Sequence, residues 1–248
     1  MPKEKNINEI DTKAIHDFYE KIQDIWIDSE KWYMHSKKII ESFILRNTKY
    51  LTGDILNAGS GGSTYGLIND SITHLDIVGN KISQFKNHVI ASIENMPFEC
   101  GHFNSCICVG SVINYCDAIR AISEVSRVLK KNSFLILEFE SSYGYEHKFT
   151  SAYKKNVCTV IDSKIENSDS NNALRQWVYS PKYVKALLES ENFKIVLSDR
   201  FHIASSLKYA RTADQAMSTN YVKFDKILKF LWPFKRHASN EIYLCKKS

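Results

Sequence analysis

The chain has 248 residues, of which 44% are hydrophobic and 25% are charged. These values exclude a wholly disordered protein and fit one folded domain with an appendage. Lys and Arg outnumber Asp and Glu by 5, but residues 201–248 alone hold nine Lys/Arg and three Asp/Glu, so residues 1–200 are nearly neutral and no basic nucleic-acid-binding surface is spread over the whole protein.

Two amphipathic helices are predicted at the N-terminus. Apolar residues recur at helical spacing over residues 10–27, which is typical of a helix with one buried face. A second helical pattern follows Asp28 and Ser29, either of which is suited to cap it. We assign residues 1–50 to an N-terminal helical lid.

From residue 54 onward, short apolar runs alternate with turns and helical stretches. The predicted strands cover residues 55–58, 73–77, 89–91, 105–109 and 134–139, with two further candidates at 193–197 and 241–245. Between the fourth and fifth strands, residues 117–130 show a clean helical pattern. Strands that alternate with helices predict βαβ units and a mainly parallel sheet, so the fold class is α/β and residues 51–140 form its core.

Residues 141–180 break this alternation. The stretch is polar, rich in Ser, Asn, Lys and Tyr, and has no clear period, so we expect an insertion on the substrate side rather than an inert connection. Ser180 and Pro181 then supply the N-cap and the first-turn proline of a helix. Residues 181–248 complete the same domain.

The segment 221–236 carries much of the C-terminal basic charge. Its apolar residues recur at helical spacing, with lysines on the opposite side. One interpretation is a basic amphipathic helix that makes a peripheral contact with an anionic membrane. The other is a helix packed on the edge of the sheet with a solvated lysine face.

The six cysteines form no CxxC pair and no zinc-ligand spacing with histidine. We therefore expect buried free thiols and no metal site. The N-terminus lacks the apolar core of a signal peptide, and no apolar run approaches the roughly 18 residues that cross a bilayer. These features predict a cytoplasmic protein.

A glycine-rich turn, Gly59-Ser60-Gly61-Gly62-Ser63, directly follows the first predicted strand. Glycines let a ligand approach the backbone, and an acid near the offset of Asp76, 17 residues after Gly59, is suited to bind both hydroxyls of a ribose. A nucleoside ligand with an anionic end is therefore expected at the carboxyl edge of the sheet. The dinucleotide fingerprint requires glycine where Thr64 stands, so a dinucleotide oxidoreductase fits poorly.

Five segments in order resemble the class I S-adenosylmethionine-dependent methyltransferases, in particular the small-molecule branch called methyltransferase type 11. They are ILNAGSGG at 55–62, LDI at 75–77, ASIENMPF at 91–98, GHFNSCICVGSVINY at 101–115 and EVSRVLKKNSFLILE at 124–138. The resemblance implies a Rossmann-like sheet of seven strands, mainly parallel with an antiparallel last strand. It also implies an inserted lid after the fifth strand.

The same resemblance implies S-adenosylmethionine as the cofactor. The family's pattern places its methionine part at the glycine turn, its ribose at the end of the second strand, its adenine after the third and its methyl group after the fourth. The residues that match these positions are Gly59, Ser60, Gly61, Asp76, Ile77, Ser92, Ile93 and Gly110. The family usually has acids where Asn57, Ser92 and Asn104 stand, so we expect binding to survive but to be weakened.

The implied reaction is O- or N-methylation of a small-molecule acceptor. A hydroxyl acceptor benefits from a general base, for which His147 is the first candidate and His202 and His35 compete, although each also fits an ordinary hydrogen-bonded histidine. The Pro-Pro-aromatic signature for methylating bases is missing after the fourth strand, so we expect no nucleic-acid substrate. A lipid or lipid-linked sugar acceptor and a non-catalytic S-adenosylmethionine-binding module remain alternatives.

Overall fold

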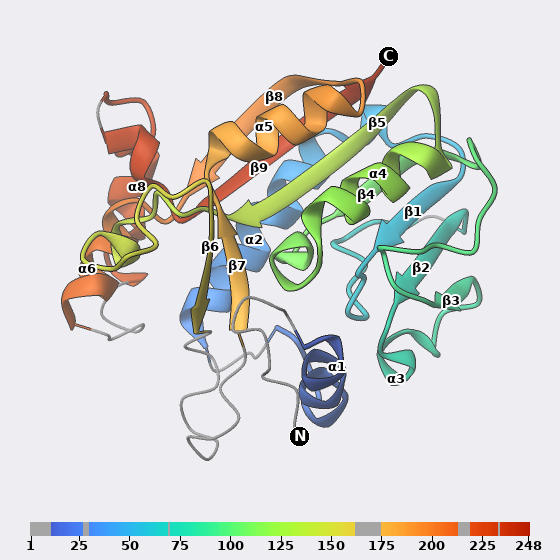
Figure 1. Cartoon of the computed structure of the whole chain (residues 1–248), viewed down its shortest axis with the longest axis horizontal. Coiled ribbons are helices and arrows are strands. Elements are labelled where there is room, and N and C mark those ends of the chain that lie inside the picture. The colour runs from blue at the N-terminus through green and yellow to red at the C-terminus, as the bar shows by residue number, and fades with distance from the viewer. Residues whose placement is uncertain (1–10, 27–29, 69, 162–174, 213–218, 233) are drawn as a thin grey trace, which may run out of the picture.

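A seven-stranded sheet forms the centre of the computed structural model, which describes residues 11–26, 30–68, 70–161, 175–212, 219–232 and 234–248 (Figure 1). The strand order is β3-β2-β1-β4-β5-β9-β8. The strands are β1 (Ile55–Ala58), β2 (Ile72–Asp76), β3 (His88–Ile90), β4 (Phe103–Cys108), β5 (Leu129–Glu140), β8 (Phe193–Phe201) and β9 (Asn240–Lys247).

The first five strands run parallel to one another, whereas β9 pairs antiparallel with both β5 and β8. This topology confirms the expected Rossmann-like sheet with an antiparallel last strand. It also brings the end of β5 beside the start of β9, because Glu140 pairs with Asn240. The carboxyl edge of the sheet therefore receives side chains from the start of β9 as well as from the ends of the parallel strands.

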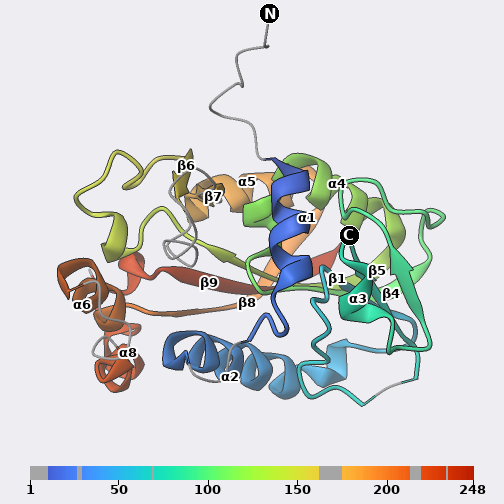
Figure 2. The same cartoon turned by 90° about the horizontal axis from the view of Figure 1, so that it is seen from below.

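Two layers of helices cover the sheet, with α2 (Lys31–Arg46) on one face and α4 (Ala118–Val128) and α5 (Pro181–Ser190) on the other (Figure 2). Because successive strand residues point to opposite faces, Leu135 and Leu137 join the α4 and α5 core while Ile136 joins the α2 core. Cys106 and Cys108 share the α4 face, as their spacing predicts.

The six cysteines are free, and three of them, Cys106, Cys108 and Cys245, are buried. Cys100 is exposed and the other two are partly exposed, so the expectation of buried thiols holds for half of the set. Among the described residues, no helix is long and apolar enough to cross a membrane.

The N-terminal region departs from the two expected helices. The first, α1, covers only Thr12–Lys21, because the backbone becomes extended at Ile22 (φ −77°, ψ 141°) and leaves the helix. Asp28 and Ser29 lie outside the described residues, and Glu30 occupies the cap position of α2 without a side-chain cap bond. Helix α4 ends at Val128 rather than at residue 130, because Leu129 already belongs to β5.

The insertion after β5 contains a hairpin that the sequence pattern did not reveal. Strands β6 (Val157–Ile161) and β7 (Arg175–Tyr179) pair antiparallel as a separate two-stranded sheet. A 3-10 turn at Tyr145–His147 precedes them. Helix α5 then begins as predicted, with the Tyr183 amide donating to Ser180 Oγ at 3.1 Å.

The C-terminal region adds α6 (Ala204–Thr212), α8 (Val222–Leu228) and a 3-10 turn at Phe234–His237, which lie beyond the carboxyl end of β8 (Figures 1 and 2). The helix expected over 221–236 is therefore limited to two turns. Most of its apolar face is not packed on the sheet, since Leu228 is partly buried but Phe224, Ile227 and Leu231 are 45%, 60% and 47% exposed. The interpretation of 221–236 as a packed amphipathic helix is wrong.

Candidate active site

The glycine turn after β1 approaches two other segments closely. Gly59 and Gly61 have φ of +67° and +54°, a left-handed conformation that glycine adopts without strain. A Cβ at Gly59 would collide with the Val112 side chain, and one at Gly61 would collide with Ile25. The turn thus leaves no room for larger residues between the sheet and the chain that covers it.

Ser60 takes a different role from the one its position in the turn implies. Its side chain is fully buried, and its hydroxyl lies 2.7 Å from His74 Nδ1 on β2. Its backbone N–H donates to the Leu75 carbonyl at 3.0 Å. Its hydroxyl and its backbone N–H are therefore both bonded to β2, and Ser60 does not line the cavity. Ser60 stabilises the glycine turn from the side of the sheet.

Asp76, the last residue of β2, holds the glycine turn through its carboxylate. Oδ2 accepts from the Gly61 amide at 2.7 Å and Oδ1 accepts from the Val78 amide at 2.9 Å. Burial raises the pKa of Asp76 above its ordinary value despite these hydrogen bonds. A carboxylate oxygen can accept two hydrogen bonds, so Asp76 can still bind the hydroxyls of a ligand.

The loop after β4 is held by a buried acid that sequence reasoning missed. Glu138 on β5 is 1% exposed, and its Oε2 accepts from the amides of Gly110 and Ser111 at 2.9 and 2.7 Å. Asn240 Nδ2 donates to its Oε1 at 2.8 Å. Burial raises the pKa of Glu138 to about 7. An acid within the apolar run 134–139 was the available signal.

These elements surround one cavity of about 1060 Å³. Of the residues expected to bind cofactor, the cavity wall contains Gly59, Gly61, Asp76, Ile77, Ser92, Ile93 and Gly110. Ligand sites usually measure about 300–1,000 Å³, so this cavity lies at the upper end of that range. Of the three positions where the family usually has an acid, only Ser92 lines the cavity.

Asn57 and Asn104 are occupied elsewhere. Asn57 Nδ2 donates to the Ser63 carbonyl at 2.8 Å, which fixes the glycine turn. Asn104 lies near the start of β4, at the opposite edge of the sheet from the cavity, where its Oδ1 accepts from Lys130 Nζ at 2.9 Å. A weaker cofactor interaction is therefore expected from Ser92 alone.

The chain between α1 and α2 covers the glycine turn. Ile25 contacts Gly61, and the ring of Trp26 packs between Gly110 and Tyr65, with the two rings edge to face at 6.3 Å. Lys81, on the short helix α3 (Gly79–Ile82), donates through Nζ to the carbonyls of Ile22 and Gln23. The N-terminal segment is thus tied down over the site by a residue only five positions after Asp76.

The far end of the cavity is formed by the insertion and the start of β9. His147 lies there, with Nε2 3.6 Å from Glu146 Oε1, and Glu146 Oε2 accepts from Ser239 Oγ at 2.7 Å. Nearby, Gln176 on β7 donates to Glu140 Oε2 at 2.7 Å. His147 therefore lines the same cavity as the cofactor-binding positions, together with Glu140 of β5 and Glu146 of the insertion.

The two competing histidines do not line this cavity. His202 is fully buried, stacks on Trp32 at 3.6 Å, and bonds Ser36 Oγ and Ser205 Oγ at 2.8 and 2.9 Å. Burial lowers the pKa of His202 well below its ordinary value. His35 packs against His202 rather than facing the cavity. Both are structural residues that join α2 to the end of β8.

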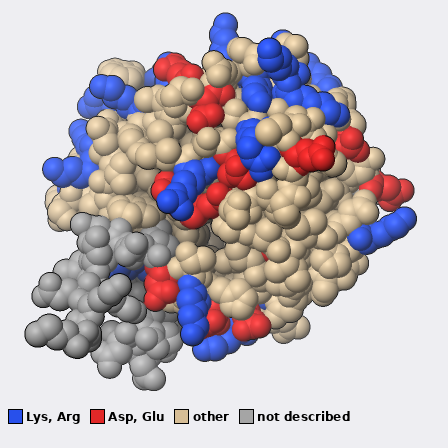
Figure 3. All heavy atoms as spheres, turned by 45° about the vertical axis from the view of Figure 1, so that its right-hand side comes forward, with Lys and Arg blue, Asp and Glu red and all other residues tan. Residues whose placement is uncertain are grey.

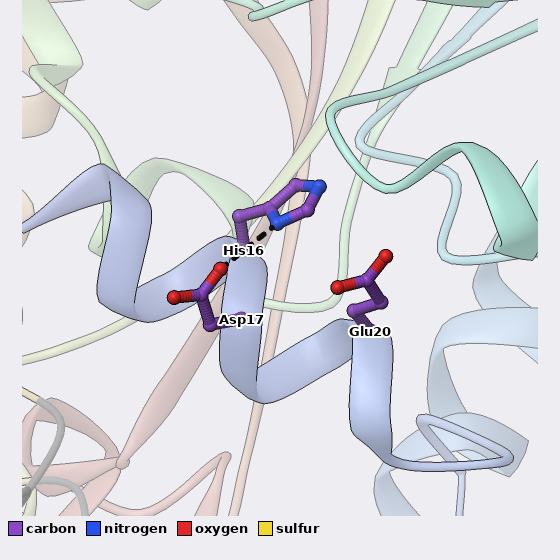
Figure 4. A group of neighbouring side chains, drawn as sticks. All are labelled: His16, Asp17 and Glu20. Atoms are coloured by element: carbon purple, nitrogen blue, oxygen red, sulfur yellow. Dashed lines mark hydrogen bonds and ion pairs between the residues drawn. The ribbon is translucent and has the colours of Figure 1, made fainter.

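A group of metal-ligand side chains lies on α1 (Figure 4). His16 Nδ1 is 3.3 Å from Asp17 Oδ1, and Glu20 follows one turn later. Ile15, Phe18 and Tyr19 line the cavity, so the group occupies the opposite, polar face of the helix. Neighbouring polar side chains are the usual content of such a face, and we assign this group no role in the site.

Comparisons with known proteins agree with this geometry. Residues 56–137 match the family model described as a methyltransferase domain. The chain is 25% identical to an uncharacterized protein of Methanocaldococcus jannaschii over an alignment of 211 residues. This alignment covers 78% of this chain and 81% of that protein.

Solved structures share the fold at low sequence identity. The 1,6-didemethyltoxoflavin-N1-methyltransferase of Burkholderia thailandensis superposes with a TM-score of 0.58 at 11% identity, over 96% of this chain and 88% of that one. An S-adenosylmethionine-dependent methyltransferase of Methanosarcina mazei gives 0.53 at 16% identity, over 82% and 96%. Residues 56–137 are therefore a methyltransferase domain, and the chain has the fold of the S-adenosylmethionine-dependent methyltransferases.

The cavity fits the cofactor of this class. Gly59 and Gly61 line the cavity with backbone that carries no Cβ, and the carboxyl group of Asp76 stands beside them at the end of β2. Ser92 and Ile93 follow β3 on the same wall, and Gly110 follows β4. The geometry therefore fits S-adenosylmethionine as the cofactor, with these residues at positions suited to hold it.

Proposed function

We propose that this enzyme methylates a small-molecule acceptor that is held inside the cavity. The observation that carries the proposal is the continuity of one cavity of about 1060 Å³ from Asp76 and Gly110 to His147 and Gln176. Helix α1 and the insertion after β5 both contribute to its walls. Such an enclosure suits a ligand of limited size and excludes water during the reaction.

The cofactor-side residues have roles that follow from their places. We propose that Asp76 holds the ribose hydroxyls, Ser92 and Ile93 flank the adenine, and Gly59 and Gly61 admit the methionine part to the backbone. Bound S-adenosylmethionine supplies a methyl group on a positively charged sulfur. Gly110 and Ser111, fixed by Glu138, then align the acceptor for an in-line displacement, in which positioning contributes most of the acceleration.

His147 is the proposed general base for a hydroxyl acceptor. The side chain lines the cavity beside Glu146, and a carboxylate near the ring stabilises the imidazolium that forms when His147 takes the acceptor's proton. An amine acceptor that is already neutral needs less assistance. O-methylation therefore depends on His147 more strongly than N-methylation does.

Incorporation of labelled methyl from S-adenosylmethionine into a panel of amines, phenols, sugars and carboxylic acids tests this proposal. We expect one chemical group to become labelled, and His147→Gln to reduce labelling of a hydroxyl acceptor while leaving S-adenosylhomocysteine affinity unchanged by calorimetry. Labelling of macromolecular substrates but of no small molecule would reject the proposed acceptor class. Equal rates for His147→Gln and the unaltered enzyme would remove His147 from the reaction.

A lipid or lipid-linked acceptor is the second candidate. It is favoured by one observation, the exposure of the apolar side chains of residues 221–236, among them Phe230 at 76%. An acceptor with a lipid tail would place its polar end in the cavity and leave the tail outside. Adding lipid extracts to the labelling panel distinguishes the two classes, because the product would then partition into organic solvent.

A further inference from the structure

Residues 221–236 present an unusually apolar surface to solvent. Seven large side chains are each between 36% and 76% exposed: Tyr221, Phe224, Ile227, Phe230, Leu231, Trp232 and Phe234. Together with Lys223, Lys226, Lys235 and Arg236, we call them the aromatic–basic surface. Single exposed apolar residues are common on soluble proteins, but a contiguous group of this size marks an interaction site.

The orientation of α8 is set by polar anchors that point inward. Asp225 is 5% exposed, and its Oδ1 accepts from the Ala204 amide at 2.6 Å while Oδ2 accepts from Ser205 Oγ at 3.0 Å. Lys229 Nζ donates to both oxygens of Asp199, at 2.8 and 2.9 Å. The helix therefore docks through Asp225, with Val222 and Leu228 partly buried, and leaves Phe224 and Ile227 outside. A surface helix usually buries such apolar residues.

The charges on this surface are cationic and lie between the aromatic rings. Lys223 Nζ is 5.4 Å from the Phe224 ring centre, and the Arg236 guanidinium is 5.2 Å from that of Trp232. The one acid of the segment 221–236 is the inward-facing Asp225. The face shown in Figure 3, in contrast, carries basic and acidic side chains intermingled.

This composition favours a lipid surface over a protein partner. Lysine is depleted from the cores of protein–protein interfaces, whereas here lysines alternate with the apolar side chains. Aromatic residues and lysines together are typical of segments that lie at the headgroup level of an anionic bilayer, where the rings enter the boundary and the amines meet phosphates. We propose that the aromatic–basic surface docks this enzyme on membranes that contain anionic lipids.

Docking at this surface has a direct structural path to the reaction site. Arg236 is followed within four residues by Ser239 and Asn240, which line the cavity. The inference goes beyond the proposed function, because binding to a bilayer requires neither the cofactor nor a lipid acceptor. It also brings the cavity near a membrane if the acceptor is delivered from one.

Co-sedimentation with vesicles tests the proposal on the full chain. The two vesicle types are phosphatidylcholine alone and an equimolar mixture of phosphatidylcholine and phosphatidylglycerol. We expect binding to the mixed vesicles only. The double variants Lys223→Glu/Lys226→Glu and Phe230→Ser/Trp232→Ser should each lower the vesicle partition coefficient by about tenfold or more.

Matched control variants change exposed residues outside the aromatic–basic surface. Lys182→Glu on α5 reverses one exposed charge, and Ile119→Ser on α4 removes an apolar side chain that is 56% exposed. Both should bind vesicles like the unaltered protein. S-adenosylhomocysteine affinity, measured for every variant, shows that each is folded and separates a failure of docking from a failure of the methyltransferase assignment.

Three outcomes would overturn the proposal. They are no binding to either vesicle type, equal binding to both types, and full binding by the two double variants. Sedimentation velocity adds a fourth: a dimer that Phe230→Ser/Trp232→Ser converts to monomer, with no vesicle binding, would assign the surface to a second copy of this chain.

Discussion

Asp76 joins the second strand to the glycine turn through the two amide hydrogen bonds of its carboxylate, and it faces the cavity. We expect Asp76→Ala to weaken S-adenosylhomocysteine binding by about tenfold or more, because the charge-assisted bonds to the ribose and the hold on Gly61 are both lost. Isothermal calorimetry measures this change. Asp17→Ala on the polar face of α1 is the control, and an equal loss in both variants would contradict the assignment.

Glu138 should make stability depend on pH. Burial raises its pKa from 4.5 to about 7, so between these values the folded protein keeps a proton that the unfolded chain has lost. The free energy of unfolding therefore falls as pH rises through this window, by up to about 3 kcal/mol from this one group. Buried Glu241, whose pKa is also raised to about 7, adds a similar slope.

Urea unfolding of Glu138→Gln at several pH values between 5 and 8 checks this expectation. The variant should lose about half of the decrease seen in the unaltered protein, because the Glu241 contribution remains. Glu189→Gln, on the exposed side of α5, should keep the full decrease. A slope that is the same in all three proteins would mean that Glu138 titrates normally.

At the residue scale, the sequence was sufficient to place those residues whose position depends on their neighbours in the chain. Gly59, Gly61 and Asp76 lie together on the cavity wall, as expected from a strand, a glycine turn and an acid that follow one another at a fixed spacing. Ser60 was misjudged, because its hydroxyl is drawn under the turn by His74 on the adjacent strand. Such a partner is known only after the register of β1 and β2 is known.

The connection between α1 and α2 behaves as a separate element that lies across the site. Gly61 and Gly101 both have positive φ, +54° and +66°, but only Gly61 has a neighbour, Ile25, where a Cβ would stand. We expect Gly61→Ala and Gly101→Ala to cost similar backbone strain, about 1 kcal/mol each. Only Gly61→Ala should also displace residues 22–26.

Calorimetry and limited proteolysis of these two variants separate strain from displacement. Gly61→Ala should bind S-adenosylhomocysteine at least about tenfold more weakly and be cleaved faster in the segment 22–26. Gly101→Ala should resemble the unaltered protein in both measurements. If both variants lose affinity equally, strain in the backbone rather than contact with Ile25 is the cause.

At the element scale, the strands of the central sheet were predictable because each combines an apolar run with turn residues on both sides. The first helix was predicted too long, because apolar residues such as Trp26 keep helical spacing although they bury against Gly110 and Tyr65. Tertiary contact decided their conformation. The β6–β7 hairpin was missed because its two short strands lie within a stretch that is polar overall and are separated by more than ten residues.

At the scale of the whole molecule, the cavity wall is mainly acidic although the protein carries a net positive charge. Among the described residues, its wall includes six carboxyl side chains and one Lys or Arg, Lys81, whereas the chain has a net charge of +5. The carboxyl groups are those of Glu30, Asp76, Glu94, Glu138, Glu140 and Glu146. An anionic acceptor is repelled by such a wall, and a neutral or cationic acceptor is accommodated or attracted.

Acceptor charge is therefore expected to govern reactivity. Among acceptors of similar size in the labelling panel, amines and neutral alcohols should react at least about tenfold faster than carboxylates or phosphates, measured as kcat/KM. Glu140→Gln/Glu146→Gln should narrow this difference, while Glu189→Gln should not. Preferred methylation of an anion by the unaltered enzyme would show that the cavity charge does not select the acceptor.

The two hydrogen bonds from Lys81 Nζ to the backbone after α1 also have a consequence for timing. Because residues 22–26 lie across the glycine turn, we expect this segment to move before S-adenosylhomocysteine dissociates, and we expect product release to be slow. Stopped-flow fluorescence of Trp26 should show S-adenosylhomocysteine leaving Lys81→Met about tenfold faster than the unaltered enzyme, with Lys86→Met as the unchanged reference. Lys81 would then control the rate at which the product leaves the enzyme.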